Sequence, residues 1–300
     1  MARMGTVAAR AEQLLGRAVV ATVAVPGGGV CTATKARLSD GSSVLVKSRP
    51  HPPAGFFAAE AAGLQWLAEA TDVGGVPVPE VRAVADDCLI MAWVEPGRPS
   101  TEAAERLGRA LAATHRAGAE TFGLADVDST WIGTMPLPQR GAGNWAGSWA
   151  EFWAAARIEP YLRLACDRTA ITETDADAVH RVLARVIELA GPAEPPARVH
   201  GDLWSGNVVW SGEARAYLVD PAAHGGHRET DLAMLALFGL PQLERVLTAY
   251  TEASPLAEGW RARVPLHQLH PLLVHAAMFG GSYGARAGAA ARAALEPQPG

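Results

Sequence analysis

Asp202 and Asn207 lie five positions apart in the segment VHGDLWSGNVVW, residues 199–210, and another carboxylate, Asp220, ends the later run AYLVD. The short apolar runs VVW and AYLVD predict a β-hairpin that returns Asp220 towards the first two side chains. Asn207 and Asp220 offer the oxygen ligands that Mg²⁺ prefers, which leaves Asp202 free to accept a hydroxyl proton. These residues predict phosphoryl transfer to an alcohol, a reaction catalysed mostly by positioning and charge neutralisation.

A cation and a carboxylate are expected to pair upstream of this segment. The chain has 24 arginines but only two lysines, Lys35 and Lys47. A lysine ammonium is a compact point charge that the wide planar guanidinium of arginine does not reproduce, so each lysine needs a reason. Lys47 ends the strand-like run SSVLVK. The alternative to a functional role for Lys47 is an ordinary lysine that faces solvent at the end of a strand. Glu60 falls on the apolar face of a predicted helix, residues 56–70, and a buried carboxylate needs a cation. We therefore predict an ion pair between Lys47 and Glu60.

Three consecutive glycines, Gly27, Gly28 and Gly29, join two strand-like runs shortly before Lys47. Glycine lets backbone N–H groups approach a phosphate closely. The spacing matches neither G-x-G-x-x-G nor G-x-x-x-x-G-K-[ST], so an ordinary hairpin is the alternative. The prediction of a phosphate-binding loop depends on its position just before Lys47 and Glu60.

The elements that must position these residues fall into two groups. Three strands joined by tight turns, one helix and two further strands are predicted before a Pro/Gly-rich connector at Glu95 to Ser100. The expected division is an N-terminal lobe at residues 1–91, a hinge at 92–100 and a C-terminal lobe at 101–300. Helices are predicted in the C-terminal lobe at 101–118, 148–165 and 172–190.

Composition excludes several classes of protein. Hydrophobic residues make up 49% of the 300 residues, enough for one large core or two moderate ones, and the net charge is −5 without runs of like charge. This argues against nucleic-acid binding and against a polybasic membrane patch, and it favours a small-molecule partner. The run AVVATVAV near the N-terminus is short and β-branched, so it predicts a strand rather than a secretory signal. No stretch reaches the ~20 apolar residues of a membrane-spanning helix.

Cysteines and histidines give no metal or disulfide pattern. Cys31, Cys88 and Cys166 are far apart, so free thiols in a reducing cytoplasm are expected. His267, His270 and the later His275 are predicted to be capping or core residues, because neither a cysteine nor a carboxylate joins them in the sequence.

The order of these features resembles the pattern of protein-kinase-like enzymes: a glycine-rich hairpin, VLVK, a helix glutamate, a hinge, H-x-D-x-x-x-x-N and a later metal-binding aspartate. More closely, the segments HGDLWSGN, DPAAHGGHRETDLAMLALFG, FGGSYG, FFAAEAAGLQWLAE, WIGTMPLPQ and SWAEFW resemble the fructosamine (ketosamine) kinase family, over about residues 10 to 285. The resemblance implies a bilobal α+β fold, with an antiparallel sheet and one main helix in the N-terminal lobe and a larger, mostly helical C-terminal lobe. It also implies an ATP- and Mg²⁺-dependent phosphotransferase that acts on a sugar hydroxyl of a ketoamine or glycated amine.

Roles for individual residues follow from the same resemblance. Asp202 would be the catalytic base, Asn207 and Asp220 the Mg²⁺ ligands, and Lys47, held by Glu60, the ligand of the α- and β-phosphates. Gly27 to Gly29 would cover the phosphates. The adenine pocket would be formed by Met91 and by the backbone of the hinge residues Ala92, Trp93 and Val94.

The resemblance also implies supporting and acceptor-binding residues. Asp231 would brace the catalytic loop through its backbone amides, and His200 would orient that backbone. Trp204, next to the base, would form a wall of the acceptor pocket, together with His224 and His227, and a core aromatic is the alternative for Trp204. Family members tend to carry a tyrosine near the middle of the segment that here reads AAHGGH, so the identity of the ketoamine stays open.

Two alternatives remain open. An aminoglycoside-type or other small-alcohol phosphotransferase would share the fold, and a nucleotide-binding protein without catalytic activity would also share it. The second is disfavoured because all five residues, Lys47, Glu60, Asp202, Asn207 and Asp220, are present. The oligomeric state is left open, and a monomer is compatible with the sequence.

Overall fold

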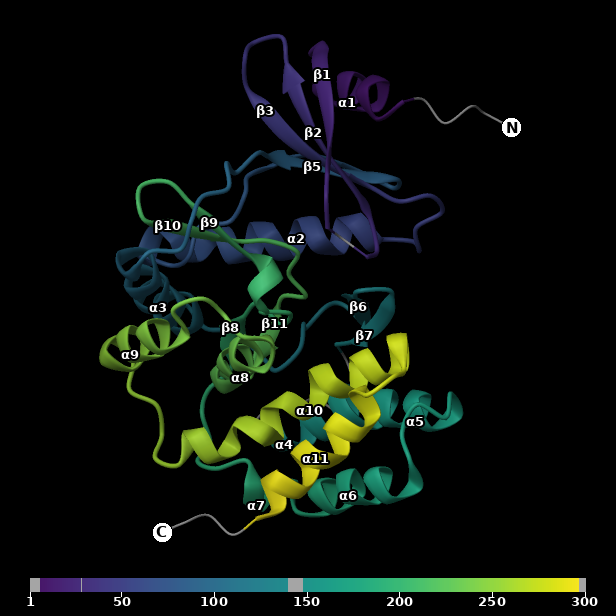
Figure 1. Ribbon diagram of the computed structural model, residues 1–300, viewed down its shortest axis with the longest axis vertical. Coiled ribbons are helices and arrows are strands. Elements are labelled where there is room, and N and C mark those ends of the chain that lie inside the picture. The colour runs from purple at the N-terminus through teal and green to yellow at the C-terminus, as the bar shows by residue number, and fades with distance from the viewer. Residues whose placement is uncertain (1–5, 28, 140–147, 297–300) are drawn as a thin grey trace.

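The computed structural model describes residues 6–27, 29–139 and 148–296. An antiparallel sheet with strand order β1-β2-β3-β5-β4 forms the N-terminal part, and most of the helices form the other part (Figure 1). The strands are β1 Val19–Val25, β2 Thr32–Leu38, β3 Ser43–Ser48, β4 Val81–Ala85 and β5 Cys88–Ala92. The predicted strands are therefore confirmed, and neighbouring strands of the sheet pair antiparallel.

Helices cover both faces of this sheet. Helix α1, Val7–Leu15, packs on one face over Val44 and Val46, and it was not predicted from the sequence. Helix α2, Phe56–Ala68, packs on the other face and continues as a 3₁₀ turn, Glu69–Val73. Because successive side chains of a strand point to opposite faces, Leu45 and Lys47 of β3 point to the α2 side while the two valines point to α1.

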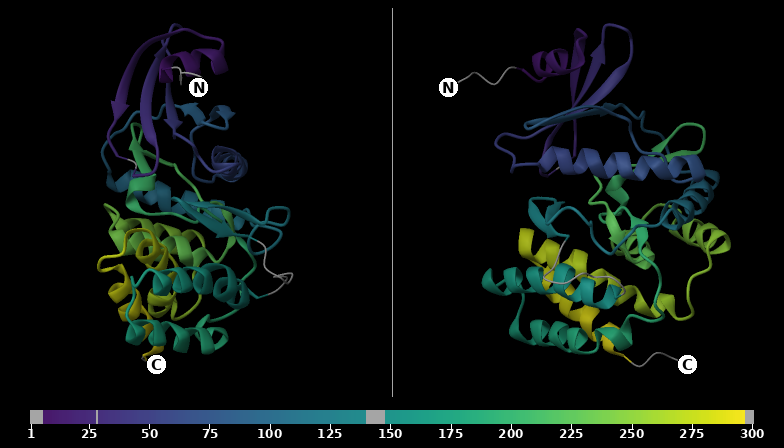
Figure 2. Two further views of the ribbon diagram at one scale, coloured as in Figure 1. Left: turned by 90° about the vertical axis from the view of Figure 1, so that its right-hand side faces the viewer. Right: turned by 180° about the vertical axis from the view of Figure 1, so that it is seen from behind.

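Figures 1 and 2 show α2 lying between the sheet and the helical part. The chain leaves β5 through residues 93–100, where Gly97 N–H donates to Trp210 O at 2.7 Å, and enters α3, Thr101–Arg116. Two two-stranded hairpins follow, β6 Ser129–Ile132 with β7 Met135–Pro138, and β9 Val208–Ser211 with β10 Arg215–Leu218. Strand β8, Ala197–Val199, pairs with β11, His224–Gly226.

Helices make up the rest of the C-terminal part. They are α4 Trp149–Phe152, α5 Glu159–Asp167, α6 Glu173–Ala184, α7 Val186–Leu189, α8 Arg228–Phe238, α9 Leu243–Ala253, α10 Trp260–Phe279 and α11 Tyr283–Leu295. The largest core cluster lies among α4 to α6, α10 and α11.

Two predicted helices are interrupted. The helix predicted at 148–165 begins with the Ser148 cap but contains a π-helical segment, Trp153–Ile158, between α4 and α5. Pro160 has no N–H to donate to Ala156 O, and the Arg157 guanidinium donates to that carbonyl instead, at 3.2 Å. The helix predicted at 172–190 breaks at Arg185, whose backbone is not helical.

Candidate active site

The loop that carries Asp202 connects β8 to β9, and one carboxylate on α8 fixes its backbone. Asp231, on α8, accepts hydrogen bonds from the backbone N–H groups of His200 and Gly201 at 2.8 and 3.0 Å. His200 bonds through Nε2 to Val219 O at 2.9 Å, and its Nδ1 accepts from Asp202 N–H at 3.2 Å. The geometry is that of a braced loop, which fits the supporting positions expected for His200 and Asp231.

Two residues behind Asp231 were missed by the sequence reasoning. His115 contacts Asp231 Oδ2 through Nε2 at 3.1 Å and the Tyr250 hydroxyl through Nδ1 at 2.8 Å. Burial alone would raise the pKa of Asp231, but the contact with His115 and the charges and hydrogen bonds around it lower that pKa. The signal for His115 was available, since it lies at helical spacing from Leu107 and Leu111 on the buried face of α3.

Asp202 and Asn207 of this loop lie close to Asp220, which follows β10. Asn207 Nδ2 donates to the Asp202 carbonyl at 2.8 Å, to Asp202 Oδ2 at 3.2 Å and to Asp220 O at 3.4 Å. These bonds orient the Asn207 amide so that its oxygen points away from the loop backbone. Burial and the neighbouring Asp220 carboxylate raise the pKa of Asp202 to about 7. The β9–β10 hairpin that brings Asp220 back is present as predicted.

The predicted ion pair between Lys47 and Glu60 is confirmed. Lys47 Nζ lies 2.6 and 2.7 Å from the two Glu60 oxygens, and it also contacts Asp220 Oδ1 at 2.9 Å. Burial would lower the pKa of Lys47, but the charges of Glu60 and Asp220 raise it, so the ammonium stays charged. Asp220 adopts a positive φ of 56°, an uncommon backbone conformation that aims its side chain at Lys47.

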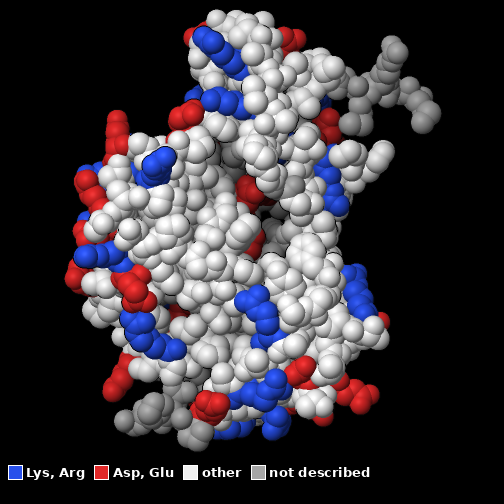
Figure 3. Space-filling model, in the orientation of Figure 1, with Lys and Arg blue, Asp and Glu red and all other residues white. Residues whose placement is uncertain are grey.

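One cavity of about 880 Å³ lies between the sheet and the helical part and brings most of the predicted residues together. Figure 3 shows it as a hollow in the middle of the molecule with acidic atoms inside. The predicted residues that line it are Gly27, Gly29, Lys47, Glu60, Met91, Ala92, Trp93, Val94, Asp202, Trp204, Asn207 and Asp220. Gly28 lies outside the described residues.

The charged residues that line this cavity are Lys47, Glu60, Asp202 and Asp220, as far as the described residues show. Three carboxylates therefore face one ammonium group. This excess of negative charge is one cause of the raised pKa of Asp202. A divalent cation with oxygen ligands fits the donor set, because it would neutralise the excess and because Asn207 and Asp220 offer hard oxygen atoms.

His224 and His227 do not lie where the sequence reasoning placed them. Both are buried and neither lines the cavity that contains Asp202. His224 Nδ1 bonds to Ala222 O at 2.8 Å, and His227 Nδ1 accepts from Glu229 N–H at 3.2 Å as the N-cap of α8. Their Nδ1 atoms thus form hydrogen bonds with backbone groups near β11 and at the start of α8. The expectation that these two histidines contact the acceptor has no support in this geometry.

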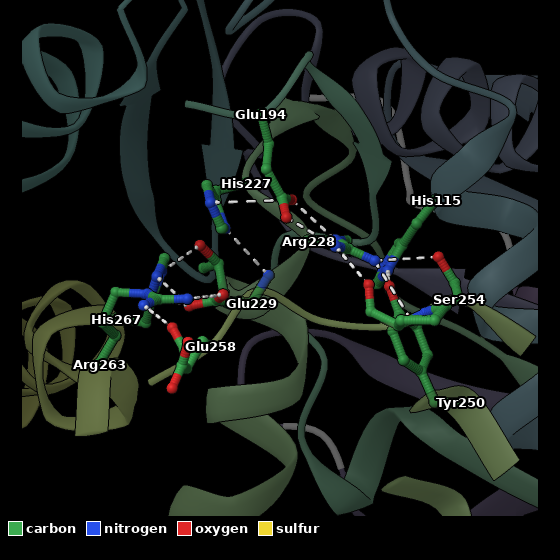
Figure 4. Close-up of polar contacts among 12 residues, drawn as sticks. His115, Glu194, His227, Arg228, Glu229, Tyr250, Ser254, Glu258, Arg263 and His267 are labelled. Atoms are coloured by element: carbon green, nitrogen blue, oxygen red, sulfur yellow. Dashed lines mark hydrogen bonds and ion pairs between the residues drawn. The ribbon is translucent and has the colours of Figure 1, made fainter. Parts of the chain in front are cut away.

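The prediction that no carboxylate joins the α10 histidines is wrong for His267. A carboxylate does join His267, because Glu229 lies 3.3 Å from its Nε2, and His227 completes a buried group with metal-ligand atoms (Figure 4). Arg263, however, donates to both Glu229 oxygens at 2.9 and 2.6 Å. A guanidinium cation thus already pairs with both oxygens of the carboxylate, so we interpret the group as a structural ion-pair network.

Aromatic residues from three segments line the cavity. Trp204 is 39% exposed beside Asp202, and Trp131 of β6 packs against Phe56 of α2 with ring centroids 6.0 Å apart. The Trp131 contact joins the β6–β7 hairpin to the N-terminal part. Trp131 was not predicted as a site residue, although it lies in the segment WIGTMPLPQ, which resembles the fructosamine kinase family.

Comparison with known proteins shows to which family this chain belongs. The family model of fructosamine kinase matches residues 4–296. This chain belongs to the fructosamine kinase family. A Thermus thermophilus protein named "probable ketoamine kinase" is 39% identical over 240 residues, which are 80% of this chain and 82% of that protein.

Solved structures agree with membership of the fructosamine kinase family. The crystal structure of a Thermobifida fusca protein assigned as a fructosamine-3-kinase has a TM-score of 0.89 and 50% identity, and the match covers 97% of this chain and 98% of that one. A macrolide 2′-phosphotransferase from Brachybacterium faecium, with a TM-score of 0.55 and 19% identity over 97% of each chain, shares the fold alone. The bilobal kinase-like α+β fold is therefore confirmed. Within the described residues, no helix has the length and apolar character needed to cross a membrane.

Proposed function

We propose that this fructosamine kinase family member transfers the γ-phosphoryl group of ATP, bound with Mg²⁺, to a sugar hydroxyl of a ketoamine. The observation that carries the proposal is the set of Lys47, Glu60, Asp202, Asn207 and Asp220, which all line one cavity. A protein of this fold without activity is not favoured, because none of the five is missing.

Each residue has a role that its position supports. Lys47, fixed by Glu60, offers a point charge to the α- and β-phosphates, and Gly27 and Gly29 at the cavity rim allow their backbone N–H groups to approach the phosphates. Asn207 and Asp220 would hold Mg²⁺, whose bound form supplies charge neutralisation at the phosphates. Asp202 accepts the proton of the attacking hydroxyl, and its raised pKa, about 7, suits a base that works near neutral pH.

The adenine ring is proposed to lie against Met91 and the segment Ala92 to Val94. Ala92 N–H already donates to Glu80 O at 2.8 Å, so Ala92 would contribute its carbonyl group and Val94 its N–H. Residues 1–91 and 101–300 would then act as two lobes about a hinge at 92–100. ATP as the phosphoryl donor and three free cysteines fit a cytoplasmic location.

The lining of the cavity favours a neutral sugar over a polycation. Apart from the residues assigned to ATP, Mg²⁺ and proton transfer, the described lining carries no charge, and it presents Trp131 and Trp204. Aminoglycosides carry several positive charges, and a site built for them would concentrate further carboxylates near the base. Aromatic faces instead suit the C–H surfaces of a sugar chain carried on an amine.

The test is a panel of acceptors assayed with Mg-ATP at steady state. A fructosamine or ribulosamine, such as a glycated lysine derivative, should be phosphorylated with a kcat/KM at least ~10-fold above that for kanamycin, about 1.4 kcal/mol in transition-state binding. Trp204→Ala should raise the KM for the ketoamine much more than the KM for ATP. If aminoglycosides are the better acceptors, the substrate assignment fails while the kinase assignment stands.

A further inference from the structure

A small internal cavity lies beside Gly201, beneath the loop that carries Asp202, and it is separate from the cavity of about 880 Å³ that contains Asp202. It measures about 10 Å³ and is lined by the π-helical segment, by His270 of α10, by His224 of β11 and by Gly201, the residue before Asp202. Its size corresponds to about one water molecule.

Three buried polar atoms without a partner belong to side chains of this lining. Among the described residues, five buried side-chain nitrogens or oxygens have no hydrogen-bond partner, and Trp153 Nε1, Arg157 Nε and His270 Nε2 are three of them. These side chains are 1%, 2% and 3% exposed. Buried polar groups are almost always hydrogen-bonded, so three orphaned atoms on side chains that line one cavity point to a ligand inside it.

The donors and acceptors can be assigned from the bonds that the side chains already make. Trp153 Nε1 and Arg157 Nε each carry a hydrogen and can only donate. His270 Nδ1 lies 3.0 Å from Arg157 O, and a carbonyl can only accept, so Nδ1 carries the proton and Nε2 presents a lone pair. His224 is in the same state, because its Nδ1 faces Ala222 O.

This mixture of donors and acceptors selects a neutral ligand. An anion would satisfy Trp153 and Arg157 but would meet the lone pairs of two neutral histidines. A cation would meet Arg157, whose guanidinium has no carboxylate partner among the described residues and donates instead to the carbonyls of Pro138 and Ala156 and to Gln139 Oε1. A water molecule accepts two hydrogen bonds and donates two, which matches the lining.

We propose that one structural water fills this cavity. It accepts hydrogen bonds from Trp153 Nε1 and Arg157 Nε, and it donates to His270 Nε2 and His224 Nε2. The water completes the solvation of a buried guanidinium, and it connects the π-helical segment to α10 and β11 directly beneath the catalytic loop. The irregular backbone at Trp153–Ile158 is thereby held by a solvent molecule as well as by side chains.

A crystal structure of the full chain at about 1.8 Å or better, with a second crystal soaked in sodium bromide, tests the proposal. We expect a single density peak within hydrogen-bonding distance of the three orphaned atoms, unchanged in bromide. An empty cavity, or bromide in its place, would overturn the proposal, because the second result would show an anion site.

Measurements in solution test the same water independently. The Trp153 indole N–H should show a cross-relaxation signal to a long-lived water in NMR spectra, assigned by its loss in Trp153→Phe. This substitution should lower the Tm by about 2 °C or more relative to Trp149→Phe, which removes an indole nitrogen from the same lining that is not among the orphaned atoms. Absence of the water signal, or equal Tm values for the two variants, would contradict the proposal.

Discussion

Burial directly changes the acid–base properties of Asp202, the proposed catalytic base. It lies beside Asp220 in a cavity with more carboxylates than cations, and its pKa is raised to about 7. Asn207 fixes the carboxylate through its Nδ2, so a substitution that keeps the shape of Asp202 should keep the loop. The charge of Asp202 is thus the property that the proposed reaction uses.

Asp202→Asn should lower turnover by about 10² or more, because the amide cannot accept the hydroxyl proton. The KM for ATP should change by less than about twofold. The Tm should not fall, because the substitution removes a carboxylate that Asp220 repels. Steady-state kinetics and calorimetry measure these quantities, and near-normal turnover would reject Asp202 as the base.

Lys47 and Lys35 provide a matched pair, since they are the two lysines of the chain. Lys47→Arg should reduce kcat/KM by about 10-fold or more, because a planar guanidinium does not fit between Glu60 and Asp220 at the distances of 2.6 to 2.9 Å that the ammonium makes. Lys35→Arg is the control. Lys35 pairs with the exposed Glu95 and lies over the Trp93 ring, contacts that arginine also makes. Equal activity of the two variants would contradict the proposed role of Lys47.

At the scale of elements, α2 is fixed to the helical part at several points. Phe56 meets Trp131 near its start, Gly63 lies against Ala223 just after Asp220, and Arg198 of β8 donates to Trp66 O near its end. These contacts place Glu60, in the middle of the helix, opposite Lys47. The position of the ion pair therefore depends on packing at both ends of α2.

The helices α3 and α9 pack closely because Gly108 has no side chain. A Cβ at this position would lie 2.2 Å from Val246 O and 2.9 Å from Tyr250 N. Gly108→Ala should therefore lower the free energy of unfolding by about 2 kcal/mol, as overpacked backbone contacts do.

The control for Gly108→Ala is Gly212→Ala, at a glycine where an added Cβ meets nothing within 4 Å. Its free energy of unfolding should stay within about 0.5 kcal/mol of the parent value. Chemical denaturation measures both variants. Equal stabilities of the two would show that α9 can move away from α3 without cost.

At the scale of the whole molecule, the C-terminal part keeps several histidines neutral. Burial lowers the pKa values of His200 and His224, and it lowers those of His227 and His270 to about 3. In the unfolded chain a histidine titrates near 6.5. Between these values the unfolded state binds more protons than the folded state.

Stability should therefore be full above about pH 6.5 and should be lost as pH falls towards 3, by up to ~1.4 kcal/mol per pH unit for each such histidine. Asp202 and Glu60 act in the opposite direction, because the raised pKa values of these two carboxyl groups make the folded state take up protons, but the four histidines outnumber them. Calorimetry at pH 7.5, 6.5 and 5.5 should show a falling Tm. Asp202→Asn should fall at least as steeply, and a constant Tm over this range would contradict the prediction.

The sequence alone determined how residues within one short segment are placed relative to one another. The interval between Asp202 and Asn207, the strand that ends at Lys47 and the helical face that carries Glu60 follow from alternation and helical repeat within short segments. These local rules are strong here, because β-branched runs and turn glycines agree with the hydrophobic pattern. They predicted the strands, the hairpin that returns Asp220 and the ion pair that the structure confirms.

Only the tertiary structure decided which residues from distant segments share a site. His224 and His227 follow Asp220 closely in the chain, yet a short strand and a helix cap turn both rings into the core. His115 contacts Asp231 and Glu229 contacts His267, although the first pair is 116 residues apart. No local pattern encodes such contacts, because they depend on how α3, α8 and α10 pack. For the same reason, the cavity beneath the catalytic loop became visible only when Trp153, Arg157 and His270 were brought together.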